Sequence, residues 1–211
     1  MPTEKRTSSD RLLEAAAVEL CKGDGNCEMS AVARTAGVSV GLAYHYFGSK
    51  AGLIAAVVEQ FYEELDREVM MAKFGLPDWR EREYLRVERS VAFHYRHPLA
   101  PVILRRLRRE PAVIEIEQAR VARQVAEGTR NIISAQKQGS VVADLDPASA
   151  AAFTLAGMRA LIAQALELPP EERPSERELT DRIWRLIQRA IGRVREENED
   201  AAVGREDGVR G

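Results

Sequence analysis

Apolar positions recur at helical spacing along the first third of the chain. After hydroxyl residues at 7–9 that can cap a helix, leucines and alanines fall on one helical face until the polar, glycine-containing segment 22–26. A second, short apolar segment begins at Met29 and leads to Gly37, which can take the positive φ of a tight turn between helices. The pattern therefore predicts two helices joined closely to whatever follows the turn.

A third and a fourth helix follow this turn. Val40 to Phe47 gives about two helical turns, preceded by a possible Ser39 cap. Gly48 and Ser49 then end this helix and begin the next, whose apolar positions continue until the head ends near Met71. The sequence thus predicts a compact head over residues 8–71 with a helix-turn-helix at about 28–47.

The remainder of the chain predicts longer helices bounded by proline, glycine and capping residues. The clearest start is a capping box, in which Ser175 precedes Glu178 by three positions. No segment has the sustained alternation of a strand, so the fold class is all-α with about nine helices, a three-helix head and a helical-bundle body. The expected body spans 72–196, with a flexible tail over 197–211. Its expected helices are 79–97, 99–109, 111 to about 139, 147 to about 168, and 175 onward.

Composition is that of an ordinary globular protein. Hydrophobic residues make up 45% and charged residues 30% of the 211 positions. Apolar stretches are interrupted before the roughly 20 residues of a membrane span, and the first ten residues carry no secretory h-region. These features predict a soluble, cytoplasmic protein without membrane contact. Cys21 and Cys27 match neither a zinc-ligand spacing nor a disulfide framework.

Charge is distributed unevenly, although the formal net charge is only −2. Met29 to Val58 contains no Asp or Glu, whereas Arg34 and Lys50 lie within it. A local surface without carboxylates can approach the phosphates of a nucleic acid even where the whole chain is not basic. The stretch therefore indicates a local nucleic-acid site.

The same stretch carries a specific motif: an Ala-Gly-Val turn at 36–38, Ser39 opening the next helix, the aromatic run 44–47, and Ser-Lys-x-x-Leu at 49–53. It resembles the DNA-binding signature of the TetR (tetracycline repressor) family. The resemblance is strong over about residues 9 to 65. It implies a regulator that binds double-stranded DNA, with contacts from Ser39, Tyr44, His45, Tyr46 and Lys50 and with Thr35 near the DNA backbone. The candidate set also includes Val40, Gly41 and Leu42, because they meet the space requirement of the groove.

The residue types suit that role physically. A helix that enters a major groove about 12 Å wide needs short side chains at its start, as at 40–42. Ser39 lies where free N–H groups favour a phosphate, and Lys50 is a natural phosphate clamp. Val40 and Leu42 are more apolar than is common in the family, which favours contacts with thymine methyl groups. Gly41 and Gly52 each lower helix propensity by roughly 1 kcal/mol, so the recognition helix is expected to firm up on DNA.

The resemblance also implies a homodimer through the last two long helices. Small residues would let helix backbones approach closely, and the apolar stripe of the last helix is longer than one small core needs. Burial of the same residues within one chain is the alternative. The expected interface comprises Phe153, Ala156, Gly157, Ala160, Leu179, Ile183, Ile187 and Ile191.

The resemblance further implies an effector cavity between the helices of the body. Each candidate lining residue could instead fill the core. The candidates are Tyr84, Val87, Val91, His94, Leu104, Leu107, Ile114 and Phe153. The effector's identity is left open by the sequence.

Competing chemistry has little support. His94 and His97, three apart, could begin a metal site, but no carboxylate motif accompanies them, and a charged histidine near a helix C-terminus is the simpler interpretation. No nucleophile, base and orienting group occur at recognisable spacing, so neither an enzyme nor a cofactor is expected. The sequence predicts a repressor that leaves a palindromic operator when a small molecule binds. The alternative is a helical small-molecule-binding protein or enzyme whose head no longer binds DNA.

Overall fold

A computed structural model of the chain describes residues 7–192, and the expected tail lies outside them. Within this part the protein is all-α, as predicted, with nine α-helices and one isolated bridge between Val141 and Gly192. The helices are α1 (Ser8–Lys22), α2 (Met29–Ala36), α3 (Val40–Phe47), α4 (Lys50–Leu65), α5 (Trp79–Arg96), α6 (Ala100–Arg105), α7 (Pro111–Lys137), α8 (Pro147–Glu167) and α9 (Glu176–Ile191). A π-helical segment, Asp66–Met70, extends α4.

The predicted helix starts carry the capping hydrogen bonds that their sequences suggest. Ser39 accepts from the Leu42 amide, and Ser49 accepts from the Gly52 amide. Ser175 and Glu178 form the reciprocal capping box at the start of α9. Each cap satisfies amides that have no partner inside the helix, which fixes where the chain turns into each element.

One predicted helix, 99–109, is shorter than expected. Helix α6 ends at Arg105, and a 3₁₀ turn, Leu107–Arg109, replaces its last part. The break allows Leu107 to be buried while Arg106 reaches outward to pair with Asp24 of the head at 2.5 Å. Arg106 therefore joins this turn to the head, whereas Arg105, Arg108 and Arg109 are exposed.

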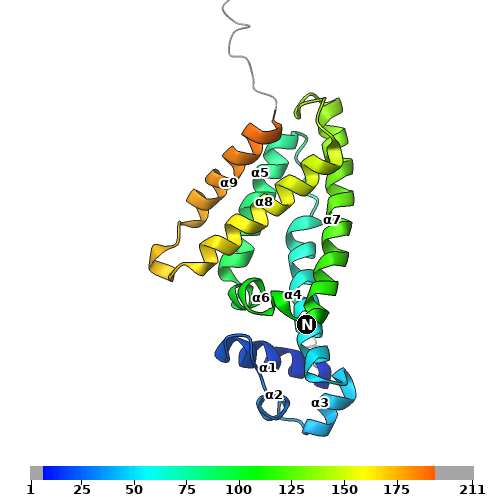
Figure 1. The fold of residues 1–211 in the computed structure, drawn as a ribbon, viewed down its shortest axis with the longest axis vertical. Coiled ribbons are helices and arrows are strands. Elements are labelled where there is room, and N and C mark those ends of the chain that lie inside the picture. Colours follow the sequence, from blue (N-terminus) through cyan, green and yellow to red (C-terminus); the bar gives the residue numbers. More distant parts are fainter. Residues whose placement is uncertain (1–6, 193–211) are drawn as a thin grey trace, which may run out of the picture.

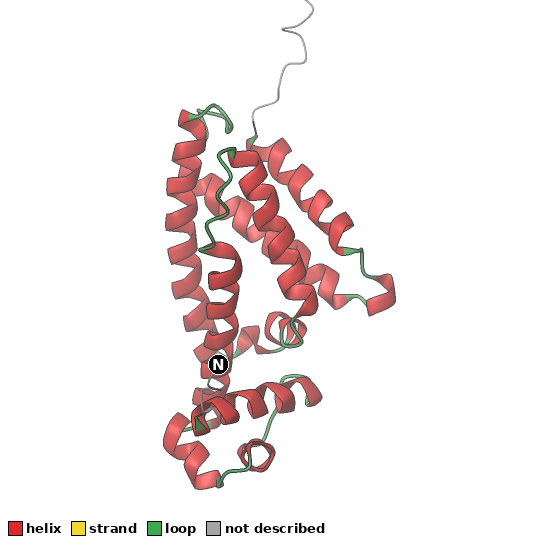
Figure 2. Cartoon of the chain, turned by 180° about the vertical axis from the view of Figure 1, so that it is seen from behind, coloured by secondary structure: helices red, strands yellow, loops and turns green. Residues whose placement is uncertain are grey.

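The helices form a small head at one end of an elongated body (Figure 1). Helices α1, α2 and α3 lie at the bottom, and α4 leaves them to run up beside α7. In the body, α5 packs against α9 and α7 packs against α8. Seen from behind in Figure 2, the loop after α4 continues along the body, away from the head, to the start of α5, which runs back toward the head. Helix α4 is therefore the continuous connection between head and body.

Aromatic rings fasten α4 to α5. The ring centroid of Phe61 lies 5.3 Å from that of Phe93 and 4.7 Å from that of His97. Both phenylalanines are 1% exposed, so each contributes a full side chain to the core. This packing joins the upper part of α4 to the body while its first turns belong to the head.

Helix α8 is long and apolar enough to cross a membrane by length and composition, although only a third of its apolar window is buried in this chain. The sequence interpretation took the apolar stretches to be shorter than this. Because α8 packs against α5, α6, α7 and α9, it is a core helix with one face left uncovered.

Candidate functional site

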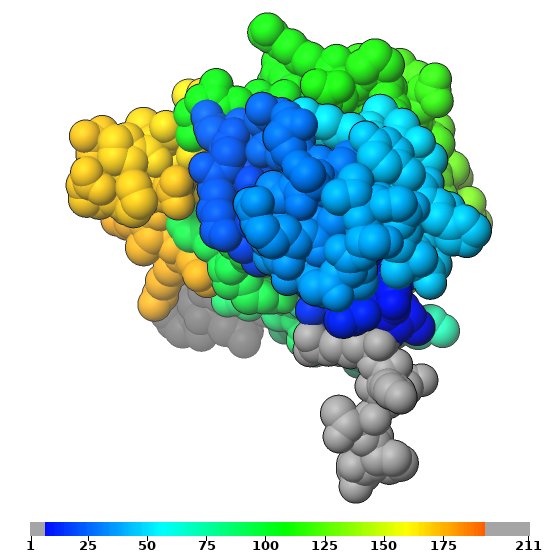
Figure 3. All heavy atoms as spheres, turned by 90° about the horizontal axis from the view of Figure 1, so that it is seen from below, coloured from blue at the N-terminus to red at the C-terminus, as the bar shows by residue number. Residues whose placement is uncertain are grey.

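Helix α3 lies at the tip of the head and turns almost all of its side chains outward. Only Ala43 of its eight residues is buried. The α2–α3 turn is made by Gly37 at φ 66°, a left-handed conformation that other residues rarely adopt. The view from below shows α2 and α3 exposed side by side at this end of the molecule (Figure 3). A two-turn helix is thus presented for contact rather than for the core.

The predicted DNA-contacting residues are mostly exposed there. Tyr44 and Tyr46 are 48% and 47% exposed, and Val40 is 38% exposed. Leu42 and Lys50 are half-buried. The remaining exposed members of the set are Thr35, Ser39, Gly41 and His45. The structure brings all nine to one end of the head, and their contacts with DNA stay a prediction.

Two of these residues are already engaged within the head. The Lys50 ammonium donates to Asn26 Oδ1 at 2.6 Å and lies 3.6 Å from Glu28 Oε1. The Thr35 hydroxyl donates to Glu19 Oε1 at 3.0 Å. A phosphate approaching Lys50 would compete with these neutral and acidic partners, so the cation is oriented but not fully neutralised.

A packing role of Gly52 was missed by the sequence interpretation, which treated it only as a weak helix former. A Cβ at this position would lie 2.2 Å from the carbonyl oxygen of Phe47. No real side chain tolerates that distance, so Gly52 allows α4 to begin directly against the end of α3. The short connection between α3 and α4, Gly48-Ser49-Lys50, was the signal in the sequence that could have revealed this packing role.

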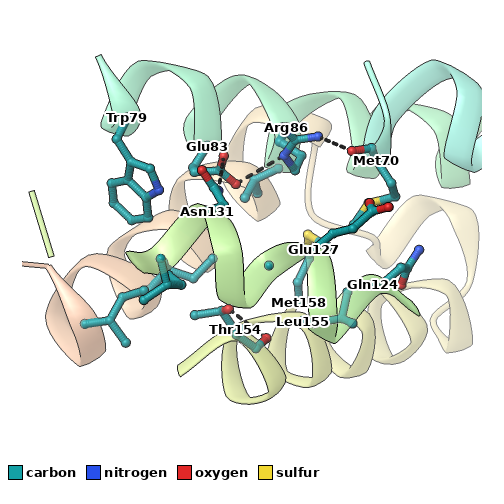
Figure 4. A pocket seen from close by; sticks show the side chains of 16 residues that line it. Met70, Trp79, Glu83, Arg86, Gln124, Glu127, Asn131, Thr154, Leu155 and Met158 are labelled. Atoms are coloured by element: carbon teal, nitrogen blue, oxygen red, sulfur yellow. Dashed lines mark hydrogen bonds and ion pairs between the residues drawn. The ribbon is translucent and has the colours of Figure 1, made fainter. Parts of the chain in front are cut away.

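A cavity of about 150 Å³ lies in the body between α5, α7, α8 and α9. Figure 4 shows Trp79 at one end and Gln124 with Glu127 toward the other, with Glu83, Arg86 and Asn131 between them. Apolar side chains from α8, including Leu155 and Met158, form the opposite wall. The sixteen lining residues are Met70, Trp79, Glu83, Arg86, Val87, Gln124, Glu127, Gly128, Asn131, Ile132, Ala151, Thr154, Leu155, Met158, Ile187 and Ile191.

The cavity touches the end of the helix that carries the head. Arg86 donates from Nη1 to the carbonyl oxygens of Val69 and Met70, each at 2.7 Å, and its Nε pairs with Glu83 at 3.2 Å. One guanidinium thus satisfies both a cavity carboxylate and the last carbonyls of the π-helical segment. Arg86 therefore links the cavity directly to the end of the segment that extends α4.

A buried ion pair holds the same segment to α7. Arg120 is 4% exposed, and its Nη2 lies 2.8 Å from Asp66 Oδ1, which also accepts from Gln124 Nε2 at 2.9 Å. Burial lowers the pKa of Arg120 while Asp66 opposes that shift. The arrangement fixes Asp66, the first residue of the π-helical segment, against the body.

Comparison with known proteins connects this geometry to a family. Residues 12–57 match the family model described as bacterial regulatory proteins, tetR family. The HTH-type transcriptional regulator BetI of Agrobacterium fabrum is 40% identical over 60 residues, which cover 28% of this chain and 29% of that protein. The head of the chain is therefore similar to the DNA-binding head of tetR-family regulators. BetI of Rhizobium meliloti is 44% identical over 54 residues, 26% of this chain and 27% of that protein. The chain thus matches less than a third of the length of these curated relatives.

Solved tetR-family structures share the fold of head and body together. A putative tetR-family regulator from Shewanella sp. PV-4 superposes with a TM-score of 0.70 at 16% identity, covering 90% of this chain and 100% of that one. The structure of AibR in complex with isovaleryl coenzyme A and operator DNA superposes with a TM-score of 0.65 at 18% identity, covering 85% and 97%. At these identities the likeness shows the tetR fold, and says nothing of this chain's own ligand.

The predicted pocket residues need correction. Of the eight, only Val87 lines the cavity. Val91, His94 and Leu107 fill the core, Leu104 packs against it, and Tyr84 donates from its hydroxyl to Asp181 at 2.9 Å. Ile114 and Phe153 are 38% and 62% exposed, and Ile114 borders a shallow groove on α7. The cavity was missed because its walls at 83, 86, 124, 127 and 131 are polar, whereas apolar positions were taken as the guide.

The predicted dimer interface is corrected for α9. Leu179, Ile183 and Ile191 are 1%, 1% and 3% exposed within a single chain, and Ile187 lines the cavity. These side chains are already covered, mainly by α5 and α8, so they cannot also contact a second copy. The members on α8 are different, because Phe153, Ala156 and Ala160 are exposed and a Cβ on Gly157 would meet open space. Their role in a dimer stays a prediction.

The helix-terminus interpretation of His94 is also wrong. His94 is 5% exposed, Nδ1 lies 2.7 Å from the Ser90 carbonyl oxygen, and burial lowers its pKa to about 4. It is therefore a neutral core residue. Burial lowers the pKa of His97 too, against the opposing effect of Glu64. Over the part of the chain that the structure describes, no three His, Cys, Asp or Glu side chains gather as a metal site.

Proposed function

We propose that this chain is a cytoplasmic, DNA-binding transcriptional repressor that acts as a homodimer on a palindromic operator and is released by a small molecule. The main support for this proposal is helix α3, which is exposed at the tip of the head. It belongs to a stretch of thirty residues without a side-chain carboxylate. The tetR family is a family of regulatory proteins rather than of enzymes, which agrees with this proposal.

The head offers the groups that a duplex requires. The N-terminus of α3 directs backbone amides outward beside Ser39, where a phosphate is favoured. Tyr44, His45 and Tyr46 add exposed hydroxyl and imidazole groups in the following turn. Val40 and Leu42 supply the apolar surface for thymine methyl groups. Phosphate contacts fix the register of the helix, and the side chains of α3 read the bases.

The uncovered face of α8 supports dimerisation. Ala156, Gly157 and Ala160 follow Phe153 by three, four and seven positions, so the four residues share one side of the helix. A second copy on this face would bury a phenylalanine and allow close helix approach at the small residues. Two heads related by a two-fold axis would then present two recognition helices to successive major grooves, about 34–36 Å apart.

The contacts of Arg86 support release by a ligand. The guanidinium joins the cavity to the last carbonyls of the segment that continues α4. A ligand that binds better when this segment is displaced shifts the population toward heads with the wrong spacing, and no other mechanism is required.

Operator selection from random duplexes with the purified full chain tests the proposal. The expected result is enrichment of a palindrome with two half-sites. Failure to enrich any palindrome would favour a small-molecule-binding protein whose head no longer binds DNA.

The variant Lys50→Ala tests the assigned role of a single residue in DNA binding. It should weaken binding to all DNA sequences alike, because it removes one phosphate contact. The slope of log affinity against log salt concentration should fall in magnitude by about one. Lys73→Ala, in the exposed segment before α5, is the matched control and should leave both unchanged. A change of base preference in Lys50→Ala would contradict the assigned role.

A further inference from the structure

The cavity contains two buried polar atoms that have no hydrogen-bond partner among residues 7–192. Trp79 is 2% exposed and Gln124 is 7% exposed, yet Trp79 Nε1 and Gln124 Oε1 make no hydrogen bond. An unsatisfied buried polar group costs about 1–3 kcal/mol, so native proteins rarely keep two in one place. Both residues line the same cavity and lie toward its two ends (Figure 4). A ligand that accepts from Trp79 and donates to Gln124 would satisfy both.

The charged groups of the cavity favour a cation. Its lining has two carboxylates, Glu83 and Glu127, and one guanidinium, Arg86. Glu83 is neutralised, because it pairs with Arg86 and accepts from Asn131 Nδ2 at 2.9 Å. Among the described residues, the one ion-pair partner of Glu127 is Arg130 at 4.0 Å, and that arginine is 70% exposed. The Glu127 carboxylate is thus weakly compensated, and it lies on the same side as Gln124.

An anionic ligand would find no free cationic partner among the lining residues. The donors of Arg86 are directed to Glu83, Val69 and Met70. The Thr154 hydroxyl is also committed, since it donates to the carbonyl oxygens of Ala150 and Ala151. A carboxylate or phosphate placed beside Glu127 would be repelled, so acidic effectors are excluded on charge.

From these contacts we infer that the cavity binds a small primary amine that carries a hydrogen-bond acceptor at its far end. The ammonium group pairs with Glu127 and donates to Gln124 Oε1, and the acceptor receives the indole N–H of Trp79. The middle of the ligand is apolar, because it lies along Leu155 and Met158. A cavity of about 150 Å³ admits a ring of benzene size. This inference deepens the proposed function by naming the class of its effector.

Calorimetry on the full chain without DNA tests the ligand class. The probes are 4-methoxyphenethylamine, its N,N,N-trimethyl analogue, 2-(4-methoxyphenyl)ethanol and 4-methoxyphenylacetate. The primary amine should bind at least about tenfold more tightly than the alcohol, because a charged hydrogen bond is lost in the alcohol. The trimethyl analogue keeps the charge without an N–H donor and should be weaker, and the acetate should not bind. Equal affinity of amine and alcohol, or binding of none of the four, would overturn the inference.

Two substitutions locate the ends of the ligand. Glu127→Gln should remove the preference for the amine over the alcohol, whereas Glu115→Gln, an exposed carboxylate on the same helix, should keep it. Trp79→Phe should lower the affinity for 4-methoxyphenethylamine by about threefold to tenfold. It should leave the affinity for phenethylamine, which lacks the ether acceptor, unchanged. An unchanged amine preference in Glu127→Gln would overturn the placement. Because no DNA is present, these results are independent of operator selection.

Discussion

Arg86 of α5 holds Met70, the last residue of the segment that continues α4, by a hydrogen bond of 2.7 Å from Nη1 to the carbonyl oxygen. The same nitrogen donates to the Val69 carbonyl oxygen. Carbonyls at a helix end have no partner inside the helix, so a body residue completes the helix that leaves the head. The order of the C-terminal end of α4 therefore depends on the cavity wall that carries Arg86.

Arg86→Met should loosen this helix end. Loss of the charged donor leaves both carbonyls without their partner, and amide exchange over residues 66–71 should speed up at least about tenfold. Hydrogen exchange followed by mass spectrometry measures it. Arg89→Met is the control, because Arg89 stacks 4.7 Å from the Phe74 ring that Arg86 also contacts. Unchanged exchange in Arg86→Met would contradict the role of Arg86.

Asp66→Ala should be strongly destabilising. It leaves Arg120, 4% exposed, as a buried charge without its carboxylate, and it removes the acceptor of Gln124. Breaking one side of a buried pair costs about 3–5 kcal/mol. Urea unfolding measures the free energy, and Asp144→Ala, at an exposed loop position, should change it by less than about 0.5 kcal/mol. Equal stability of the two variants would show that Asp66 does not compensate Arg120.

Local signals in the sequence predicted the helices well. The bounds of α3 and the capping box of α9 follow from residues within a few positions of each start, and such signals act wherever the chain is placed. Exposure of Tyr44 and Tyr46 agrees with their position on a helix of the motif. These features depend on neighbours in sequence, which is why they could be found there.

Partners distant in sequence were harder to predict. The stripe of Leu179, Ile183 and Ile191 correctly indicated a buried face, but periodicity does not reveal whether the same chain or a second copy buries it. The polar cavity walls depend on Glu83 meeting Asn131, 48 positions away. Apolar patterning therefore located the core and could not locate the cavity.

Two glycines near α3 should respond oppositely to alanine. Gly52→Ala places a Cβ 2.2 Å from the Phe47 carbonyl oxygen and should destabilise the head by about 2 kcal/mol or more. Gly41→Ala, where the nearest side-chain atom is 4.0 Å away, should stabilise α3 by up to about 1 kcal/mol. Thermal unfolding of the two variants measures the difference. A neutral Gly52→Ala would show that α4 can shift away from α3 without cost.

Acidification should destabilise the protein through His94. Its pKa is lowered to about 4 in the folded chain, below the unfolded value of about 6.5. The unfolded state therefore binds the proton first, and stability falls as the pH drops from about 6.5 toward 4, by about 2 kcal/mol between pH 7.5 and 5. Urea unfolding at the two pH values measures this loss, to which His97 adds in the same direction. His94→Gln should reduce it, and an unreduced loss would assign the effect elsewhere.

Phe153→Glu should convert the proposed dimer into monomers. The ring is 62% exposed on a face of α8 that also carries Ala156 and Ala160, so an isologous contact would bring two copies of this position together. Two carboxylates buried there would lose their hydration without gaining partners. Light scattering after size exclusion measures the mass. Ile133→Glu, on the exposed side of α7 at 38% exposure, is the matched control and should leave the mass unchanged. A Phe153→Glu variant that still formed dimers would place the interface on another surface, while equal loss of dimer in both variants would indicate a general effect of the added charge rather than a contact at α8.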